Sequence, residues 1–162
     1  MPEYFVQVYR LLKPGGLFLN HGISRVVEHS QETNWLKPIL QRVLGDGTFI
    51  QHYIFPDGEL VPVSEANLVA EQAGFEVRDV ENLREHYALT LRQWVKRLEA
   101  HQAQAIQVSD EVTYRTWRLY MAASAHGFEH GNISVNQTLL SKPAAGVSHL
   151  PLTRSDLYAG MP

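Results

Sequence analysis

The sequence of 162 residues contains no cysteine, which excludes disulfide bonds, thiolate metal sites and a cysteine nucleophile. It also contains no run approaching the roughly 18 apolar residues of a transmembrane helix. The first residues, Met-Pro-Glu-Tyr-Phe, lack the basic and apolar regions of a signal peptide. The formal net charge of -3 gives no electrostatic footprint for nucleic acid. We therefore expect a cytoplasmic protein that has no nucleic-acid partner.

What the sequence does contain is the composition of one folded domain, with 44% hydrophobic and 19% charged residues. From Pro143 onward, Pro, Ala, Gly and Ser dominate. We expect residues 1–142 to form the folded part and residues 143–162 to form a flexible C-terminal tail.

The first 25 residues predict a helix followed by a strand. Apolar residues at helical spacing predict an amphipathic helix that begins near Met1 and ends before Pro14, which has no N–H and disfavours helix in the preceding residue. Leu17 to Leu19 form a continuous apolar run, as in a strand covered on both faces, which is predicted to end in the polar segment Asn20-His21-Gly22. Polar residues at the carboxyl ends of strands in an open α/β sheet bind ligands, so His21 is the first candidate site residue.

The rest of the chain alternates between helical and strand patterns. Spacing predicts helices over 34–44 and 65–73, a strand over 75–80, two helices near 91–98 and from about 109, and a last strand over 133–140. The segment 49–58 ends in a Pro-Asp-Gly turn and is expected to be a loop or short strand. Three strands with about five helices make an α/β pattern, and so small a sheet is expected to expose an apolar edge.

Four segments then occur in a recognisable order. They are Leu12-Lys13-Pro14-Gly15-Gly16 running to His21-Gly22-Ile23, Tyr53 to Leu60 with the sequence YIFPDGEL, Glu81 to Leu91 followed by Trp94, and Tyr114 to Tyr120 leading to Asn136-Gln137. Together they resemble the cyclopropane-fatty-acyl-phospholipid synthase family, which includes the mycolic acid cyclopropane synthases. The resemblance implies the C-terminal portion of a class I S-adenosylmethionine-dependent methyltransferase, with a Rossmann-like sheet of about three strands and flanking helices.

In that family the first four strands and the glycine-rich cofactor loop precede the region that this chain resembles. Gly45-Asp46-Gly47 has some likeness to such a loop, but it follows a predicted helix rather than a strand. The resemblance therefore implies S-adenosylmethionine as cofactor, with its site largely outside this chain, and we assign no cofactor-binding residue. We expect the isolated chain to be inactive.

The resemblance implies methyl or methylene transfer to the double bond of an unsaturated phospholipid acyl chain. In the family, the π electrons of that bond attack the sulfonium methyl, and the resulting carbocation loses a proton to a bound bicarbonate. By similarity, His21 and Tyr87 would hold the bicarbonate through their side chains and Ile23 through its backbone. Five aromatic residues would line the acyl tunnel and bind substrate: Tyr53, Phe55, Trp94, Trp117 and Tyr120. The implied partners are an upstream N-terminal half or a second copy, with peripheral contact at the inner membrane face.

Other readings of the same residues stay open. His21 and Tyr87 are also compatible with hydrogen-bonded structural roles, and the late aromatic residues with an ordinary core. A non-catalytic binding or assembly module, derived from half of a methyltransferase, could pair through its exposed sheet edge. The segment His126 to His130 matches the His-x-x-Glu-His pattern of zinc hydrolases, but its glycines weaken a helix there, so we predict a solvated turn and no metal site.

Overall fold

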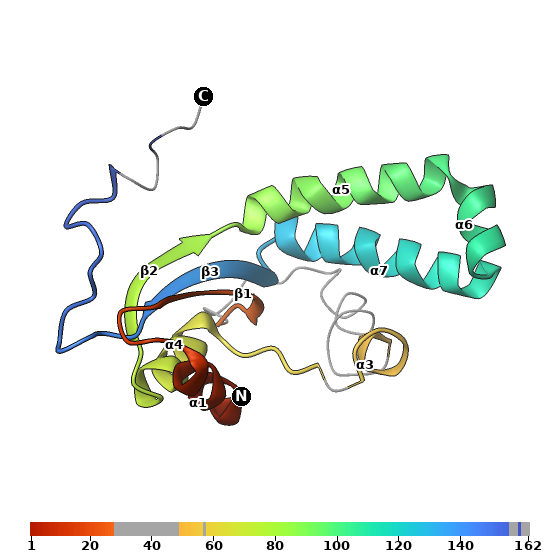
Figure 1. Ribbon diagram of the computed structural model, residues 1–162. Coiled ribbons are helices and arrows are strands. Elements are labelled where there is room, and N and C mark those ends of the chain that lie inside the picture. Colours follow the sequence, from red (N-terminus) through yellow and green to blue (C-terminus); the bar gives the residue numbers. More distant parts are fainter. Residues whose placement is uncertain (28–48, 57, 156–158, 160–162) are drawn as a thin grey trace. The chain divides into compact units, whose positions relative to one another are not determined.

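The computed structural model describes residues 1–27, 49–56, 58–155 and 159 (Figure 1). Its helices are α1 (Pro2–Leu11), α3 (Ile50–Tyr53), α4 (Val63–Gln72), α5 (Arg84–Ala100), α6 (Gln102–Val108) and α7 (Glu111–Glu129). Its strands are β1 (Leu17–Arg25), β2 (Glu76–Asn82) and β3 (Ile133–Ser141). The predicted helix over 34–44 and the Gly45-Asp46-Gly47 turn lie outside the described residues. Elsewhere the alternation of helices and strands confirms the predicted α/β class.

The three strands form one sheet in the order β1-β3-β2. At one end, the Gly15 N–H donates to the Lys142 carbonyl (2.7 Å) and the Lys142 N–H to the Gly16 carbonyl (2.9 Å), so the start of β1 lies beside the end of β3. At the other end, the Leu83 N–H donates to the Val135 carbonyl (2.9 Å), so the end of β2 lies beside the start of β3. The central strand β3 is therefore antiparallel to both neighbours.

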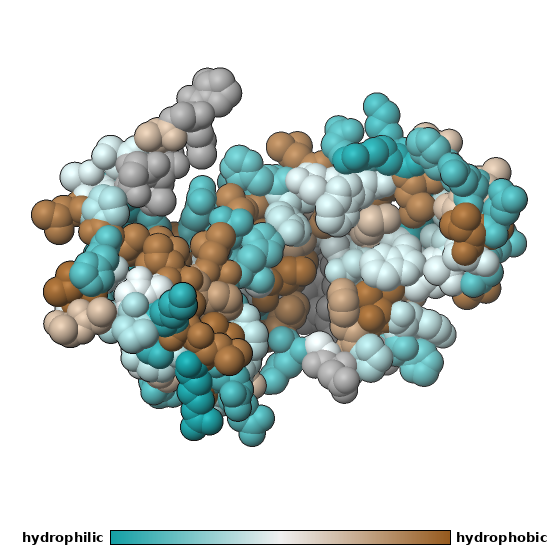
Figure 2. Space-filling view, in the orientation of Figure 1, coloured by the Kyte–Doolittle hydropathy of each residue, from teal (hydrophilic) through white to brown (hydrophobic). Residues whose placement is uncertain are grey.

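Strand β1 differs from its prediction in length and in exposure. It continues through the polar segment to Arg25, so His21 lies in the middle of the strand rather than at its end. Burial alternates along β1, and Leu17 and Leu19 are 44% and 52% exposed. The prediction that helices cover both faces is therefore wrong for the described residues. In Figure 2, brown apolar surface gathers over the region of α1 and the strands.

The chain divides into two compact units, of which the first comprises Met1–Asn20, Ser64–Val80 and Thr138–Pro162. Its core joins α1, α4 and the strands through four buried side chains, Phe5, Ala70, Phe75 and Leu140. The Lys142 ammonium donates to the carbonyls of Tyr9 (2.7 Å) and Leu12 (2.9 Å), which satisfies the end of α1 where Pro14 stops it. This confirms the predicted end of the first helix.

The C-terminal segment has some fixed contacts in this first unit. Ala144 and Val147 form an isolated antiparallel bridge, and Arg154 pairs with Asp79 at 3.1 Å. The division into a folded part and a flexible tail at residue 143 stays a prediction.

The second unit comprises His21–Val63 and Glu81–Gln137. Helices α5 and α7 lie side by side in Figure 1 and share a core with β3, made of Ala88, Leu91, Met121, Ala125, Phe128 and Val135. Both long helices confirm their predictions. The short helix α6 between them was not predicted, and residues 50–53 form the helix α3 rather than only a loop or strand.

Helix α7 continues through Gly127 to Glu129, so the predicted solvated turn at residues 126–130 is wrong. Glycine costs a helix about 1 kcal/mol relative to alanine. Here Gly127 is buried between Ala125 and Phe128, which are 3% and 1% exposed, and this packing outweighs the local cost. Among the described residues, no helix combines the length and apolar character needed to cross a membrane.

Candidate functional site

Two side chains of the second unit, Tyr87 and Gln137, contact the ring of His21. The His21 Nε2 lies 2.9 Å from the Tyr87 hydroxyl oxygen, and the His21 Nδ1 lies 3.3 Å from the Gln137 amide nitrogen. The His21 and Tyr87 rings are tilted by 42° with their centroids 5.5 Å apart. The structure thus brings together the two side chains predicted to hold an anion, although they are 66 residues apart in the sequence.

Strand geometry explains why these groups converge. Side chains alternate between the faces of a strand, so His21 and Ile23 share one face of β1 while Ser24 lies on the other. On that other face, Ser24 accepts a hydrogen bond from the Asn136 amide at 2.8 Å. The next residue of β3, Gln137, therefore lies on the same face as His21. Ile23 lies two residues after His21 on β1, and its backbone role toward an anion stays a prediction.

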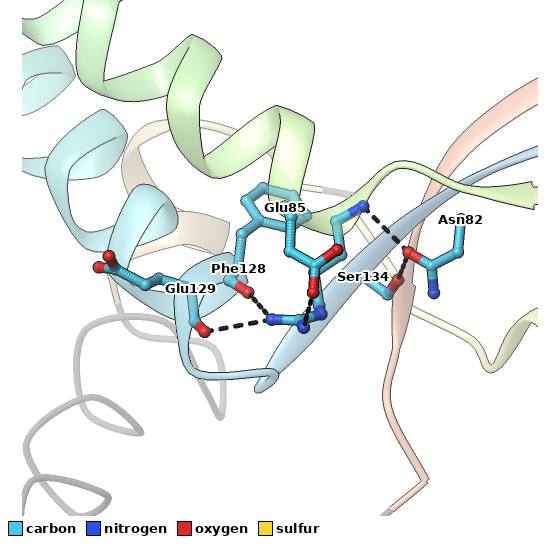
Figure 3. A network of polar contacts seen from close by, with 6 residues as sticks. Asn82, Glu85, Phe128, Glu129 and Ser134 are labelled. Carbon is cyan, nitrogen blue, oxygen red and sulfur yellow. Dashed lines mark hydrogen bonds and ion pairs between the residues drawn. The ribbon is translucent and has the colours of Figure 1, made fainter.

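Tyr87 reaches this face from the first turn of α5, whose start is anchored by Arg84. Figure 3 shows this network. The Arg84 guanidinium donates to the carbonyls of Phe128 (2.6 Å) and Glu129 (3.1 Å) at the end of α7 and pairs with Glu85 (2.7 Å). The Arg84 N–H donates to the Asn82 side chain at 2.9 Å. The network ties the beginning of α5 to the end of α7 and so fixes the turn that carries Tyr87.

The Tyr87 ring itself packs on the core. Its centroid lies 5.6 Å from that of Phe128, which is 1% exposed. His21 is exposed and Tyr87 is half-buried. The pair is thus packed on the core at Tyr87 and is accessible to solvent at His21.

Of the five predicted substrate-binding aromatics, the structure brings three together. The Tyr120 ring lies 5.9 Å from Phe55 and 5.7 Å from Trp117, both in edge-to-face geometry. Tyr120 also packs against the same buried core as Tyr87. Burial raises the pKa of the Tyr120 hydroxyl, partly offset by its hydrogen bond with Ser124, so this phenol stays neutral at physiological pH.

Tyr53 and Trp94 are not part of that cluster. Tyr53 is 60% exposed and contacts Phe49 and His52 around α3, with ring centroids 5.4 and 4.6 Å away. Trp94 lies on α5 and is 45% exposed. Whether any of the five aromatic residues binds an acyl chain stays a prediction.

Gln137 is the site residue that reasoning from the sequence missed. The strand pattern over 133–140 predicts that Gln137 and Asn136 lie on opposite faces of the strand. It does not predict that Gln137 contacts a histidine 116 positions earlier. Only the pairing of β1 with β3 creates that contact.

A second cluster at the end of α7 has the side chains of a metal site. The ligand atoms of His126, Glu129 and His130 all lie within 4.8 Å of one another. However, Arg92 forms an ion pair with Glu129 and lowers the pKa of that carboxyl. A cation at this cluster would compete with Arg92 for the single carboxylate. The absence of a metal site here stays a prediction.

An open pocket in the second unit lies next to this cluster. It is lined by Val26, Asn82, Arg84, Glu129, His130, Gly131 and Ser134. None of the predicted site residues lines it. Most of its polar groups already form hydrogen bonds with Arg84 or with one another. Among these, the Ser134 hydroxyl donates to the Asn82 side chain at 3.0 Å.

In the part of the chain that the structure describes, neither β2 nor β3 is followed by a glycine-rich cofactor loop. Strand β2 leads into α5 through Leu83 alone, and β3 is followed by Lys142 and Pro143, without a glycine-rich turn into a helix. The placement of the cofactor site largely outside the chain stays a prediction.

Comparison with known proteins bears on the identity of these elements. Residues 1–138 match the family described as mycolic acid cyclopropane synthetase. A probable fatty acid methyltransferase of Pseudomonas putida is 41% identical over 156 residues, which cover 96% of this chain and 37% of that protein. A probable fatty acid methyltransferase of Mycobacterium tuberculosis is 37% identical over 93% of this chain and 33% of its own length. The chain thus spans about a third of the length of these relatives.

Solved structures show the same fold. The mycolic acid cyclopropane synthase CmaA1, in complex with SAH and CTAB, matches with a TM-score of 0.74 and 30% identity over 86% of this chain and 48% of that one. The cyclopropane synthase MmaA2 from Mycobacterium tuberculosis matches with a TM-score of 0.73 and 28% identity over the same shares. The α/β fold is therefore that of the class I methyltransferases, and the chain belongs to the mycolic acid cyclopropane synthetase family.

Proposed function

We propose that the chain supplies the acceptor-side part of an S-adenosylmethionine-dependent methyltransferase that acts on the double bond of unsaturated phospholipid acyl chains. The observation that carries the proposal is the contact of 2.9 Å between the His21 ring and the Tyr87 hydroxyl. Two relatives named as fatty acid methyltransferases support the lipid substrate, and the CmaA1 complex with SAH supports the cofactor. Conversion of the double bond to a cyclopropane ring is the specific reaction that we propose.

In this proposal His21 and Tyr87 hold a bicarbonate ion through their side chains, and Ile23 through its backbone. The Tyr87 phenol can donate a hydrogen bond to an anion, and the His21 ring holds that phenol in place through their contact of 2.9 Å, so these residues fit such a group. Bound bicarbonate supplies a weak base, and the two side chains fix its position beside the reacting carbon. The Phe55, Trp117 and Tyr120 rings offer apolar faces suited to an acyl chain and to nearby positive charge.

S-adenosylmethionine supplies the electrophilic methyl group when it is bound, and we propose that a segment upstream of this chain holds it. The chain alone is then inactive. Unsaturated phospholipid must be reached from a bilayer surface, so the proposal also includes peripheral contact with the inner face of the membrane in the cytoplasm.

A non-catalytic assembly module is the second candidate, and the exposed face of β1 favours it. Leu17 and Leu19 present apolar side chains there at 44% and 52% exposure. In the first candidate the upstream segment covers them, and in the second another chain or a second copy does so. Sedimentation equilibrium of the purified chain tests whether a second copy covers this face, because self-assembly gives a mass that rises with concentration.

The test of the first candidate is a chimera that places this chain behind the upstream part of the Pseudomonas putida relative. We expect the chimera to transfer radiolabelled methyl groups to vesicles of dioleoyl phospholipid and not to fully saturated vesicles. The chain alone should transfer none. Saturable binding of S-adenosylmethionine to the isolated chain in calorimetry would contradict the placement of the cofactor site.

Tyr87→Phe in the chimera removes one donor from the anion while it keeps the ring on Phe128. We expect kcat to fall by about 10²–10³ with little change in KM for the vesicles. Tyr4→Phe is the matched control, because it removes an exposed hydroxyl 3.4 Å from Asn20 in the first unit. Equal activity in the two variants would refute the role of Tyr87.

A further inference from the structure

Gln137 contacts the one ring nitrogen of His21 that Tyr87 does not use. The Gln137 amide nitrogen lies 3.3 Å from Nδ1, and the Tyr87 hydroxyl lies 2.9 Å from Nε2. The two nitrogens of a neutral imidazole differ, since one carries hydrogen and the other carries a lone pair. The partner of one nitrogen therefore decides what the other can do.

An amide nitrogen can only donate. With the Gln137 amide nitrogen toward the ring, Nδ1 must accept and so carries no hydrogen. The hydrogen of neutral His21 then resides on Nε2 and is donated to the Tyr87 oxygen. The Tyr87 O–H is not consumed in that bond and stays available for another acceptor.

The opposite arrangement would have the opposite effect. If the Gln137 oxygen faced the ring, Nδ1 would carry the hydrogen and Nε2 would accept from the Tyr87 O–H. The phenol would then have no hydrogen left to give an anion. The orientation of one amide on β3 thus determines whether Tyr87 acts as a donor to a ligand.

We propose that Gln137 is a positioning residue that holds neutral His21 in its Nε2–H tautomer and thereby frees the Tyr87 hydroxyl to donate to an anion. That an anion binds to Tyr87 rests on the proposed function, whereas the tautomer of His21 does not depend on it. Gln137 is suited to this task because it is half-buried on the central strand, between Asn136 and Thr138, whose side chains are fixed by hydrogen bonds to Ser24 and Asn67.

The experiment measures the tautomer directly in the 162-residue chain. Long-range ¹H–¹⁵N correlation spectra at pH 8 distinguish protonated from unprotonated ring nitrogens, and a His21→Gln sample assigns the signals of His21 among the eight histidines. We expect the Nε2–H form in about tenfold excess, the effect of one hydrogen bond that the other tautomer lacks. A wild-type ring that is mainly Nδ1–H would overturn the proposal.

Two substitutions test the cause. Gln137→Glu replaces the donor with an acceptor of nearly the same shape, and we expect it to shift His21 toward the Nδ1–H form. Gln137→Leu removes the hydrogen bond without replacing it, and the excess should fall toward that of a free imidazole. Gln93→Glu makes the same chemical change on the exposed surface of α5 and should leave His21 unchanged.

Circular dichroism identifies variants that remain folded. A folded Gln137→Glu protein whose His21 tautomer matches the wild type would overturn the proposal. This readout needs neither cofactor nor lipid, so its failure is distinct from failure of the proposed methyl transfer. In the chimera, Gln137→Glu should lower kcat in the same direction as Tyr87→Phe, while an unchanged kcat would refute the link from tautomer to reaction.

Discussion

Arg84 gives the most specific test of how the site is held in place. Its guanidinium donates to the Phe128 carbonyl at 2.6 Å and to the Glu129 carbonyl at 3.1 Å, which both belong to the last turn of α7; the Phe128 carbonyl also accepts from the Gly131 N–H at a longer 3.3 Å. The Arg84 side chain is 27% exposed, whereas its ion-pair partner Glu85 is 81% exposed, so the pair itself contributes little. A hydrogen bond to a charged group contributes about 1.5–3 kcal/mol, and the second, longer bond adds less. Arg84→Ala should therefore lower the free energy of unfolding by about 3 kcal/mol.

That loss is measurable by urea unfolding followed by circular dichroism. With a slope of about 2 kcal/mol per molar urea, the midpoint should fall by about 1.5 M. Arg84→Lys keeps the charge without the planar fork and should lose about half as much. Arg92→Ala, which breaks only the exposed pair with Glu129, should change the midpoint far less. An Arg84→Ala midpoint equal to that of Arg92→Ala would refute the reasoning.

Three further predictions concern α7. Phe128→Ala removes a ring that is 1% exposed and should cost about 3–5 kcal/mol in urea unfolding, unless the core collapses around it. The Asp110 carboxylate caps α7 by accepting from the Thr113 N–H at 2.8 Å, and this hydrogen bond lowers the pKa of Asp110. The cap therefore stabilises the fold above the pKa that Asp110 has in the unfolded chain, and the stabilisation is lost as pH falls. Asp110→Ala should flatten the acid side of a plot of melting temperature against pH. Burial and the nearby His130 lower the pKa of His126 in the folded protein. The unfolded chain then binds more protons at this residue, so the free energy of unfolding falls as pH drops below about 6.5. His126→Gln should make the free energy of unfolding depend less steeply on pH in this range.

Local signals in the sequence predicted the helix ends well. Pro14 removes a donor at a fixed place, and the helix before it ends at Leu11, as expected. The apolar spacing in residues 91–98 and after residue 109 likewise identified α5 and α7, because their buried faces repeat at the helical period. Such signals lie within one element, so the sequence alone carries them.

The errors occurred where distant segments decide the outcome. The polar segment at His21 was predicted to end a strand, but pairing with β3 more than 100 residues later extends β1 to Arg25. Gly127 was expected to weaken a helix, but its neighbours Ala125 and Phe128 pack into the core that α7 shares with α5 and β3, and this packing outweighs the local preference of the glycine. The contact between His21 and Tyr87 came only from family resemblance, since no spacing rule relates residues 66 apart.

The position of His21 inside β1 has a chemical consequence. A side chain at a strand end can adopt many directions, whereas a residue in the middle of a strand holds its side chain perpendicular to the sheet, because the residues before and after it along β1 belong to the same strand. His21, Tyr87 and Gln137 all belong to the second unit, so the geometry that sets the hydrogen bonds of the imidazole is complete within it. In the proposed division of labour, the chain preorganises an anion site without cofactor, while a segment upstream of it holds the methyl donor.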